Sequence, residues 1–211
     1  TPGTLQTRSM GGVGVGMRNA AAVNLLNPAA YSAVRPKSFL FDFGLEGQCF
    51  YNSQKYYGQT LNTSYYTVNF HDIAFQLPIA KHLGLGFSLT PYSSVGYRMK
   101  QEVDDDEIWG NIGRVQYQWD GDGDVTEVKL GLGWEIFRGF SIGIAAQYYW
   151  GDIQRIYKTA ILENITGGGL IADATGTETY SVSRFKGQFG VQWSPISNRR
   201  RILTIGATYD I

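Results

Sequence analysis

Hydrophobic and polar positions alternate along most of the chain, from Phe39 to Ile211, in segments about ten residues long. Between Leu83 and Thr90 every odd position is large and apolar, and every even position is small or hydroxylated. The same alternation recurs over residues 128–136, 140–150, 186–193 and 203–211. A period of two is typical of strands with two unlike faces. The pattern therefore predicts an all-β protein.

The two faces favour an antiparallel transmembrane β-barrel of the outer-membrane type. In such a barrel each strand turns one apolar face to lipid and one small or polar face to the lumen. Aromatic residues also gather near the expected strand ends, among them Tyr92, Trp134, Trp150 and Trp193, as interfacial girdles require. A soluble β-sandwich alternates in the same way and stays open as the alternative. The length of the alternating segments and their small opposite faces favour the barrel.

Seven strands are expected, at about residues 38–50, 65–79, 83–102, 112–137, 140–157, 179–193 and 201–211, the fourth being interrupted at Asp120–Asp124. Short connections at 80–82, 138–139 and 194–200 alternate with long polar ones, which assigns the short ones to the periplasmic side. A last strand without a closing partner leaves an edge that lipid cannot satisfy. We therefore expect about half of a larger barrel.

The start of the chain differs from the rest. Residues 1–36 do not alternate long enough to span a bilayer, so we expect a hatch or plug segment at 1–36 and barrel strands over 37–211. The alanine-rich stretch 20–26 favours one or two helical turns. Pro28 is expected to end that helix, because it disfavours helical geometry at Asn27. A compact segment of this kind fits inside a lumen.

Composition removes several function classes. The formal net charge of zero gives no reason to expect nucleic acid as a partner. The single Cys49 excludes an intramolecular disulfide and a cysteine cluster for zinc. No run of eighteen apolar residues is present, so no transmembrane helix is expected.

Candidate chemistry is sparse as well. Asp120, Asp122 and Asp124 begin like a calcium loop, but Val125 and Gly131 stand where that loop requires glycine and glutamate. An acidic bulge is favoured over a metal site, and no cofactor is expected. The two histidines and the lack of a Gly-x-Ser-x-Gly motif argue against an enzyme.

Several short segments of the sequence resemble those of a known protein family. The run Met10–Gly16, the motif Asn27-Pro28-Ala29, the first strand from Phe39, and the phrases 89–97 and 130–134 resemble the FadL/TodX/OmpP1 family in the form found in Bacteroidetes. The resemblance implies a fourteen-stranded barrel of the bacterial outer membrane, with the N-terminal segment as a hatch in the lumen. It also implies passive transport of hydrophobic small molecules, long-chain fatty-acid-like or aromatic, through the lumen and a lateral opening.

Two groups of site residues follow. Asn24, Asn27, Pro28 and Tyr31 are the expected hatch and ligand residues, although Asn27-Pro28 also reads as a simple helix stop. Pro91, Tyr92, Ser93 and Ser94 are the expected lateral-opening kink, and an ordinary strand end at the interface explains them equally well.

The expected partners are membrane lipid, a hydrophobic ligand, and other outer-membrane or surface proteins that bind the long loops. One branch of the resembled family serves protein secretion and surface attachment, so a scaffold of that kind is the alternative function.

Overall fold

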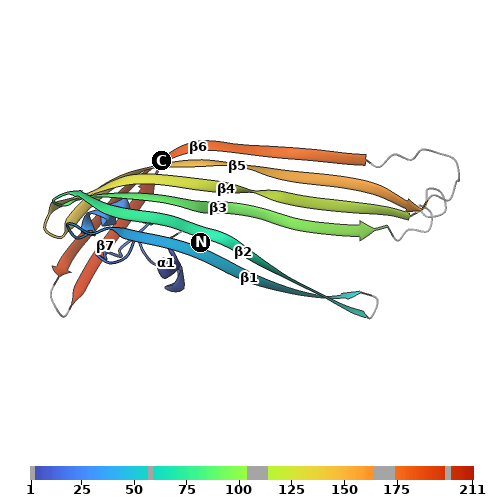
Figure 1. Ribbon diagram of the computed structural model, residues 1–211, viewed down its shortest axis with the longest axis horizontal. Helices are drawn as coiled ribbons and strands as arrows, with labels where there is room; N and C mark the ends of the chain where they lie inside the picture. Colours follow the sequence, from blue (N-terminus) through green and yellow to red (C-terminus); the bar gives the residue numbers. More distant parts are fainter. Residues whose placement is uncertain (1–2, 57–58, 104–113, 164–173, 198–200) are drawn as a thin grey trace. The chain divides into compact units, whose positions relative to one another are not determined.

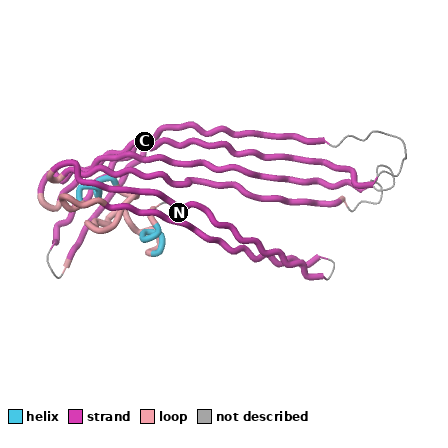
Figure 2. The backbone as a smooth tube through the Cα atoms, in the orientation of Figure 1, coloured by secondary structure: helices cyan, strands magenta, loops and turns pink. Residues whose placement is uncertain are grey.

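A computed structural model describes residues 3–56, 59–103, 114–163, 174–197 and 201–211. Seven antiparallel strands form one sheet, and their order in the sheet is their order in the chain (Figure 1). They are β1 Leu40–Tyr56, β2 Gln59–Ala80, β3 Leu83–Glu102, β4 Arg114–Phe137, β5 Phe140–Glu163, β6 Ala174–Ser197 and β7 Ile202–Asp210. The helices are the α-helix α1, Leu5–Ser9, and the 3-10 helix η1, Pro28–Ala33 (Figure 2). Neither they nor any other helix in the described ranges could cross a membrane.

The predicted all-β fold is confirmed, and the strand ends at the turns 81–82 and 138–139 lie within one residue of where the sequence placed them. The sixth strand was expected to end at about residue 193, but β6 extends to Ser197, which pairs with Ile202. The strand ends at the long connections were misjudged. Residues 51–64 were expected to form a connection, yet β1 and β2 stay paired there as far as Tyr56↔Gln59. A polar stretch is predicted as a loop from its low hydropathy. Its backbone N–H and C=O groups can still pair with a neighbouring strand. For the same reason β4 runs through Asp120–Asp124, where an interruption was expected.

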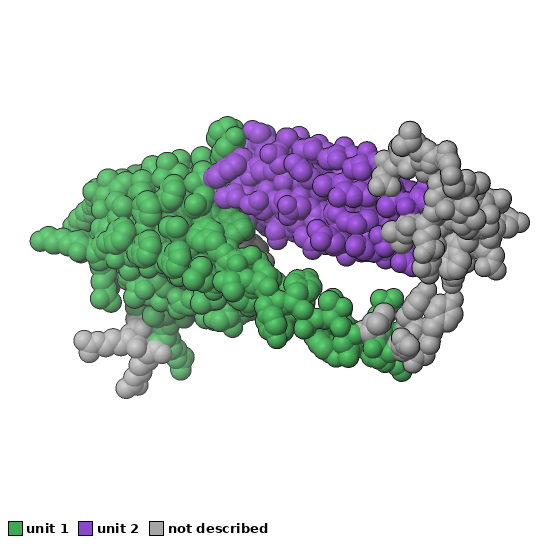
Figure 3. Space-filling view, turned by 45° about the vertical axis from the view of Figure 1, so that its right-hand side comes forward, with its two compact units in different colours: residues 1–91, 127–148, 185–211 green, residues 92–126, 149–184 purple. Residues whose placement is uncertain are grey.

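The chain divides into two compact units (Figure 3). Unit 1 contains residues 1–91, 127–148 and 185–211, and unit 2 contains 92–126 and 149–184. Unit 2 holds ring contacts such as Tyr92 against Tyr149 and the ion pair between Arg98 and Asp120 at 3.1 Å. Unit 1 holds the N-terminal segment and the short turns, and the remaining description concerns this unit unless stated otherwise.

In unit 1 the exposed face of the sheet is apolar and the buried face is polar or small, which is the reverse of a soluble protein. Trp134 and Trp193 are half exposed, whereas the side chain of Gln192 is 1% exposed. Along β4, residues 129, 131 and 133 are buried and polar or small, while 130, 132 and 134 are apolar and exposed. A soluble sandwich buries its apolar face. A lipid-facing exterior and a polar interior explain this pattern.

The N-terminal segment, defined here as residues 3–38, reaches all seven strands. The contacts are Arg8 with Glu46 on β1, Asn24 with Gln76 on β2, Tyr31 with Gly84 on β3, Leu25 with Lys129 on β4, Arg18 with Ser141 on β5, and Val15 with Gln192 on β6 and Gly206 on β7. Seven flat strands would be roughly 29 Å wide at the usual spacing. The sheet of unit 1 therefore curls around the segment.

The helix expected within residues 20–26 is absent, and this prediction was wrong. The Asn24 side chain holds the backbone by accepting from the Leu26 amide at 2.9 Å, which competes with helical pairing. Pro28 begins η1 instead of ending a helix, with Asn27 as the N-cap. Proline suits the first helical position because its missing N–H needs no partner there.

Candidate functional site: the packed interior of unit 1

Glycines form a groove on the inner face of the strands. A Cβ atom at Gly84, Gly133 or Gly143 would overlap with the backbone of residues 28–32. The Tyr31 ring lies over Gly86 and Gly131, where a Cβ would stand 2.6 and 2.8 Å from ring atoms. Glycine at these positions lets two backbones approach. The small inward residues seen in the sequence are therefore the contact surface for η1.

Two asparagines hold the shape of the N-terminal segment. The Asn24 Nδ2 donates to the carbonyls of Gly14 and Met17, at 2.7 and 2.8 Å. The Asn27 Nδ2 donates to Val15 O at 2.8 Å and to Val191 O on β6 at 3.1 Å, while its Oδ1 accepts from the Ala29 amide. The Asn27 side chain thus both binds the segment to the sheet and caps η1.

All four residues expected in the hatch are buried in this packing: Asn24, Asn27, Pro28 and Tyr31. Tyr31 is 1% exposed, and burial raises the pKa of its phenol above the usual value. Contact of these residues with a ligand stays a prediction, as does the domain boundary at residue 36.

Two long polar side chains reach from the strands to the segment. Lys129, 3% exposed, donates from Nζ to Leu25 O at 2.6 Å and to the Gln188 side chain. The Gln192 Nε2 donates to Val15 O at 3.0 Å and to Met17 O at 3.1 Å. Buried polar groups need such partners. These side chains bind carbonyl groups of the segment, so the contacts to β4 and β6 do not depend on the side chains of Val15, Met17 and Leu25.

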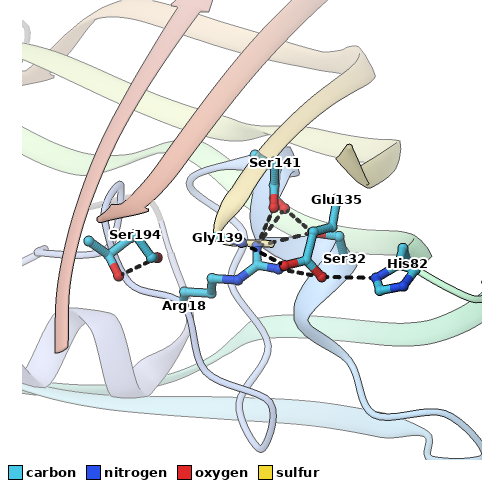
Figure 4. Close-up of polar contacts among 9 residues, drawn as sticks. Arg18, Ser32, His82, Glu135, Gly139, Ser141 and Ser194 are labelled. Atoms are coloured by element: carbon cyan, nitrogen blue, oxygen red, sulfur yellow. Dashed lines mark hydrogen bonds and ion pairs between the residues drawn. The ribbon is translucent and has the colours of Figure 1, made fainter. Parts of the chain in front are cut away.

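Arg18 is the centre of a third group of contacts (Figure 4). Its Nη1 donates to Ser141 Oγ on β5 at 2.7 Å and to Ser32 Oγ of η1 at 3.0 Å. Its Nη2 lies 3.7 Å from Glu135 Oε2, which also contacts His82 Nδ1 at 3.1 Å. Burial lowers the pKa of the Arg18 guanidinium from its usual value, but an arginine stays charged in any such setting.

The short turns are fastened to one another beside Arg18. The Glu135 amide donates to His82 O at 2.8 Å, and the Ser194 amide donates to Gly139 O at 2.6 Å. His82 and Gly139, the second residue of each turn, adopt φ of 67° and 86°, the left-handed region that a type II turn uses at this position. The turns β2–β3 and β4–β5 and the end of β6 thus form one rim.

A cavity of about 840 Å³ lies inside this rim. The N-terminal segment supplies its inner wall through Ser32 and Val34, and the short turns supply its border through Lys81 and Arg138. We call it the turn-end pocket. Its charged lining residues are Arg18, Arg35, Lys81, His82, Glu135 and Arg138.

Pro91–Ser94, the expected lateral-opening kink, is not part of the packed interior. The pairing of β2 with β3 extends from Ala80↔Leu83 to Ile73↔Leu89, two residues before Pro91. A proline fits a position where no ladder donor is needed. Tyr92, Ser93 and Ser94 continue as exposed residues of β3. Their role as an opening stays a prediction.

The sequence reasoning missed the residues that hold the segment, namely Arg18, Gln76, Lys129, Glu135, Ser141 and Gln192. A signal was present, because Gln76, Lys129 and Gln192 are long polar side chains on a face whose other residues are mostly small. Such residues in a barrel interior mark places where the lumen is filled. Arg18 carried no comparable signal, since it lies outside every alternating segment.

A curled antiparallel sheet with an apolar exterior, a polar interior and an internal N-terminal segment defines a β-barrel-type protein of the bacterial outer membrane. A family model narrows this class. The BamG model matches residues 1–211, so the chain belongs to the BamG family, which is associated with the outer membrane. No curated protein and no solved structure matches it.

The family match confirms the predicted location and corrects two expectations. The resemblance to FadL/TodX transporters was wrong, because the family that the chain matches over its whole length is BamG. Transport of hydrophobic molecules falls with it, and so does the alternative of a secretion or surface-attachment scaffold. Within the phrase 130–134, which helped to suggest the resemblance, Gly131 and Gly133 are explained by packing of the N-terminal segment against β4.

Proposed function

We propose that this protein takes part in the assembly of outer-membrane proteins, as a membrane-embedded component that associates with the Bam complex. The observation that carries the proposal is the BamG family match over residues 1–211. Association with other outer-membrane components is what this family indicates. The finer proposal is that the partners are subunits of the assembly machinery and that lipid surrounds the apolar outer face.

The packed interior supports a role by association. Main-chain groups of the N-terminal segment accept hydrogen bonds from the buried side chains of Asn27, Lys129 and Gln192. Displacing the segment would leave these polar groups without partners, at about 1–3 kcal/mol for each. A filled interior suits a protein that offers its rim and loops to partners. We further propose that the protein is not an enzyme.

Co-purification tests the proposal directly. The tagged protein is extracted from outer membranes in a mild detergent, resolved on a native gel and analysed by mass spectrometry. We expect Bam complex subunits in the same band. A tagged outer-membrane barrel of another family, expressed at the same level, is the control for trapping in shared micelles.

Depletion supplies the functional test. When the protein is depleted, we expect folded outer-membrane barrels to fall in abundance and their unfolded forms to accumulate, as read by heat-modifiable migration on gels. Normal levels of these barrels after depletion, together with a native band free of Bam subunits, would show the proposal to be wrong.

A further inference from the structure

The turn-end pocket carries an excess of positive charge. Arg18, Arg35, Lys81, His82 and Arg138 line it, and Glu135 is the one carboxylate among its described lining residues. Glu135 is already engaged, since Arg18 lies 3.7 Å and His82 3.1 Å from it. Arg35, Lys81 and Arg138 are exposed and form no ion pair with any residue that the structure describes. Three cations therefore surround a cavity of about 840 Å³ without a counter-charge.

Their placement is fixed by the fold. Arg35 follows η1, Lys81 lies in the β2–β3 turn, and Arg138 lies in the β4–β5 turn. The backbone bonds Glu135 N to His82 O and Ser194 N to Gly139 O hold the two turns and the end of β6 in position. The cations thus come from three elements around one hollow. A rigid border with convergent charge is suited to binding an extended anionic chain.

We propose that the turn-end pocket binds an acidic segment, rich in Asp and Glu, of a periplasmic partner protein. The inference rests on the proposed function, because it names the chemistry by which an assembly partner would dock. Short turns of outer-membrane barrels face the periplasm, so the pocket opens toward soluble domains. Its inner wall is Ser32 and Val34 of the internal segment, which places it inside the rim. An anionic lipid would have to bring its headgroup over the turns, away from its acyl chains.

A binding experiment tests the pocket with the purified full chain in neutral detergent. The probe is a fluorescent octaglutamate peptide, followed by anisotropy. The test variant carries Arg35→Glu, Lys81→Glu and Arg138→Glu. We expect wild-type binding that weakens as salt rises, and roughly tenfold or greater loss in the variant.

The matched control reverses three exposed cations elsewhere, as Lys55→Glu, Lys100→Glu and Arg184→Glu on β1, β3 and β6. Net charge changes equally in both variants, so only the location differs. Equal loss in both, or no loss in the pocket variant, would overturn the proposal. So would stronger competition by dioctanoyl-phosphatidylglycerol than by unlabelled peptide, because the ligand would then be a lipid phosphate.

Co-purification in cells separates this proposal from the proposed function. If both wild type and pocket variant retain Bam subunits, the docking role of the pocket is wrong and the proposed function stands. If neither retains them while the peptide still distinguishes the variants, the pocket binds acidic segments and the proposed function is wrong. Heat-modifiable migration of each variant shows that it has folded.

Discussion

Gly190 and Gly187 lie on the same strand, β6, yet face different surroundings. A Cβ at Gly190 would overlap with the Asn27 side chain and lie 2.8 Å from Pro28 Cδ, whereas a Cβ at Gly187 would meet nothing within 4 Å. We expect Gly190→Ala to lower the free energy of unfolding by about 1–3 kcal/mol through overpacking. Gly187→Ala should leave it nearly unchanged. Urea unfolding in detergent, followed by tryptophan fluorescence, measures both; equal effects would mean that the segment is not seated as described.

Lys129 on β4 is a buried charged residue, with 3% of it exposed. Lys129→Met keeps the length of the side chain but removes the donor to Leu25 O and Gln188. We expect the free energy of unfolding to fall by about 1–3 kcal/mol, because two buried acceptors lose their partner. Lys55→Met, at an exposed position of β1, is the control. A variant as stable as the wild type would show that water replaces the ammonium group there.

At the scale of elements, the N-terminal segment contains both protected and accessible cleavage sites for trypsin. Arg18 is partly buried and bonded to Ser32 and Ser141, while Lys37 is exposed. Cleavage after Arg18 therefore requires local opening, and cleavage after Lys37 does not. We expect the Arg18 site to be cut at least tenfold more slowly, roughly the effect of an opening free energy above 1.4 kcal/mol. Mass spectrometry of timed digests measures both rates, and equal rates would contradict the packed segment.

The strands were predictable from the sequence, but their ends at the long connections were not. Leu83–Thr90 and 128–136 alternate so regularly that strand, face and turn followed directly. Residues 51–64 lack that alternation, as is expected of strand ends that extend beyond the apolar band of a barrel. Their pairing in β1 and β2 depends on the neighbouring strand, which a local pattern does not record.

The site was only partly predictable for a related reason. Asn27 and Pro28 drew attention because their residue types restrict the backbone. The partners of the segment lie on strands far away in sequence, as with Asn27 and Val191, 164 residues apart. No spacing rule connects such residues. The wrong helix at 20–26 has the same origin, since the Asn24 side chain accepts from the Leu26 amide, which local propensity assigns to helical pairing.

At the scale of the whole molecule, the exposed aromatic residues predict contact with lipid. Trp134 and Trp193 are 51% and 50% exposed on the outer face. In bilayers with brominated acyl chains we expect strong quenching of tryptophan fluorescence, much reduced in the double variant Trp134→Phe, Trp193→Phe. Acrylamide, a quencher dissolved in water, should act weakly on these two side chains. Strong quenching by acrylamide with none by bromolipid would place this face in water.

The contacts between the N-terminal segment and the last strands have a consequence for the timing of folding. Gln192 and Val15 are 177 residues apart, and closing a chain of that length costs on the order of 4–5 kcal/mol in entropy. Residues 14–27 precede every strand in the sequence, yet their sites on β6 and β7 form only when those strands have joined the sheet. The segment therefore waits, unseated, while the strands acquire their register. Its seating is a late event that depends on every strand through β7 being in place.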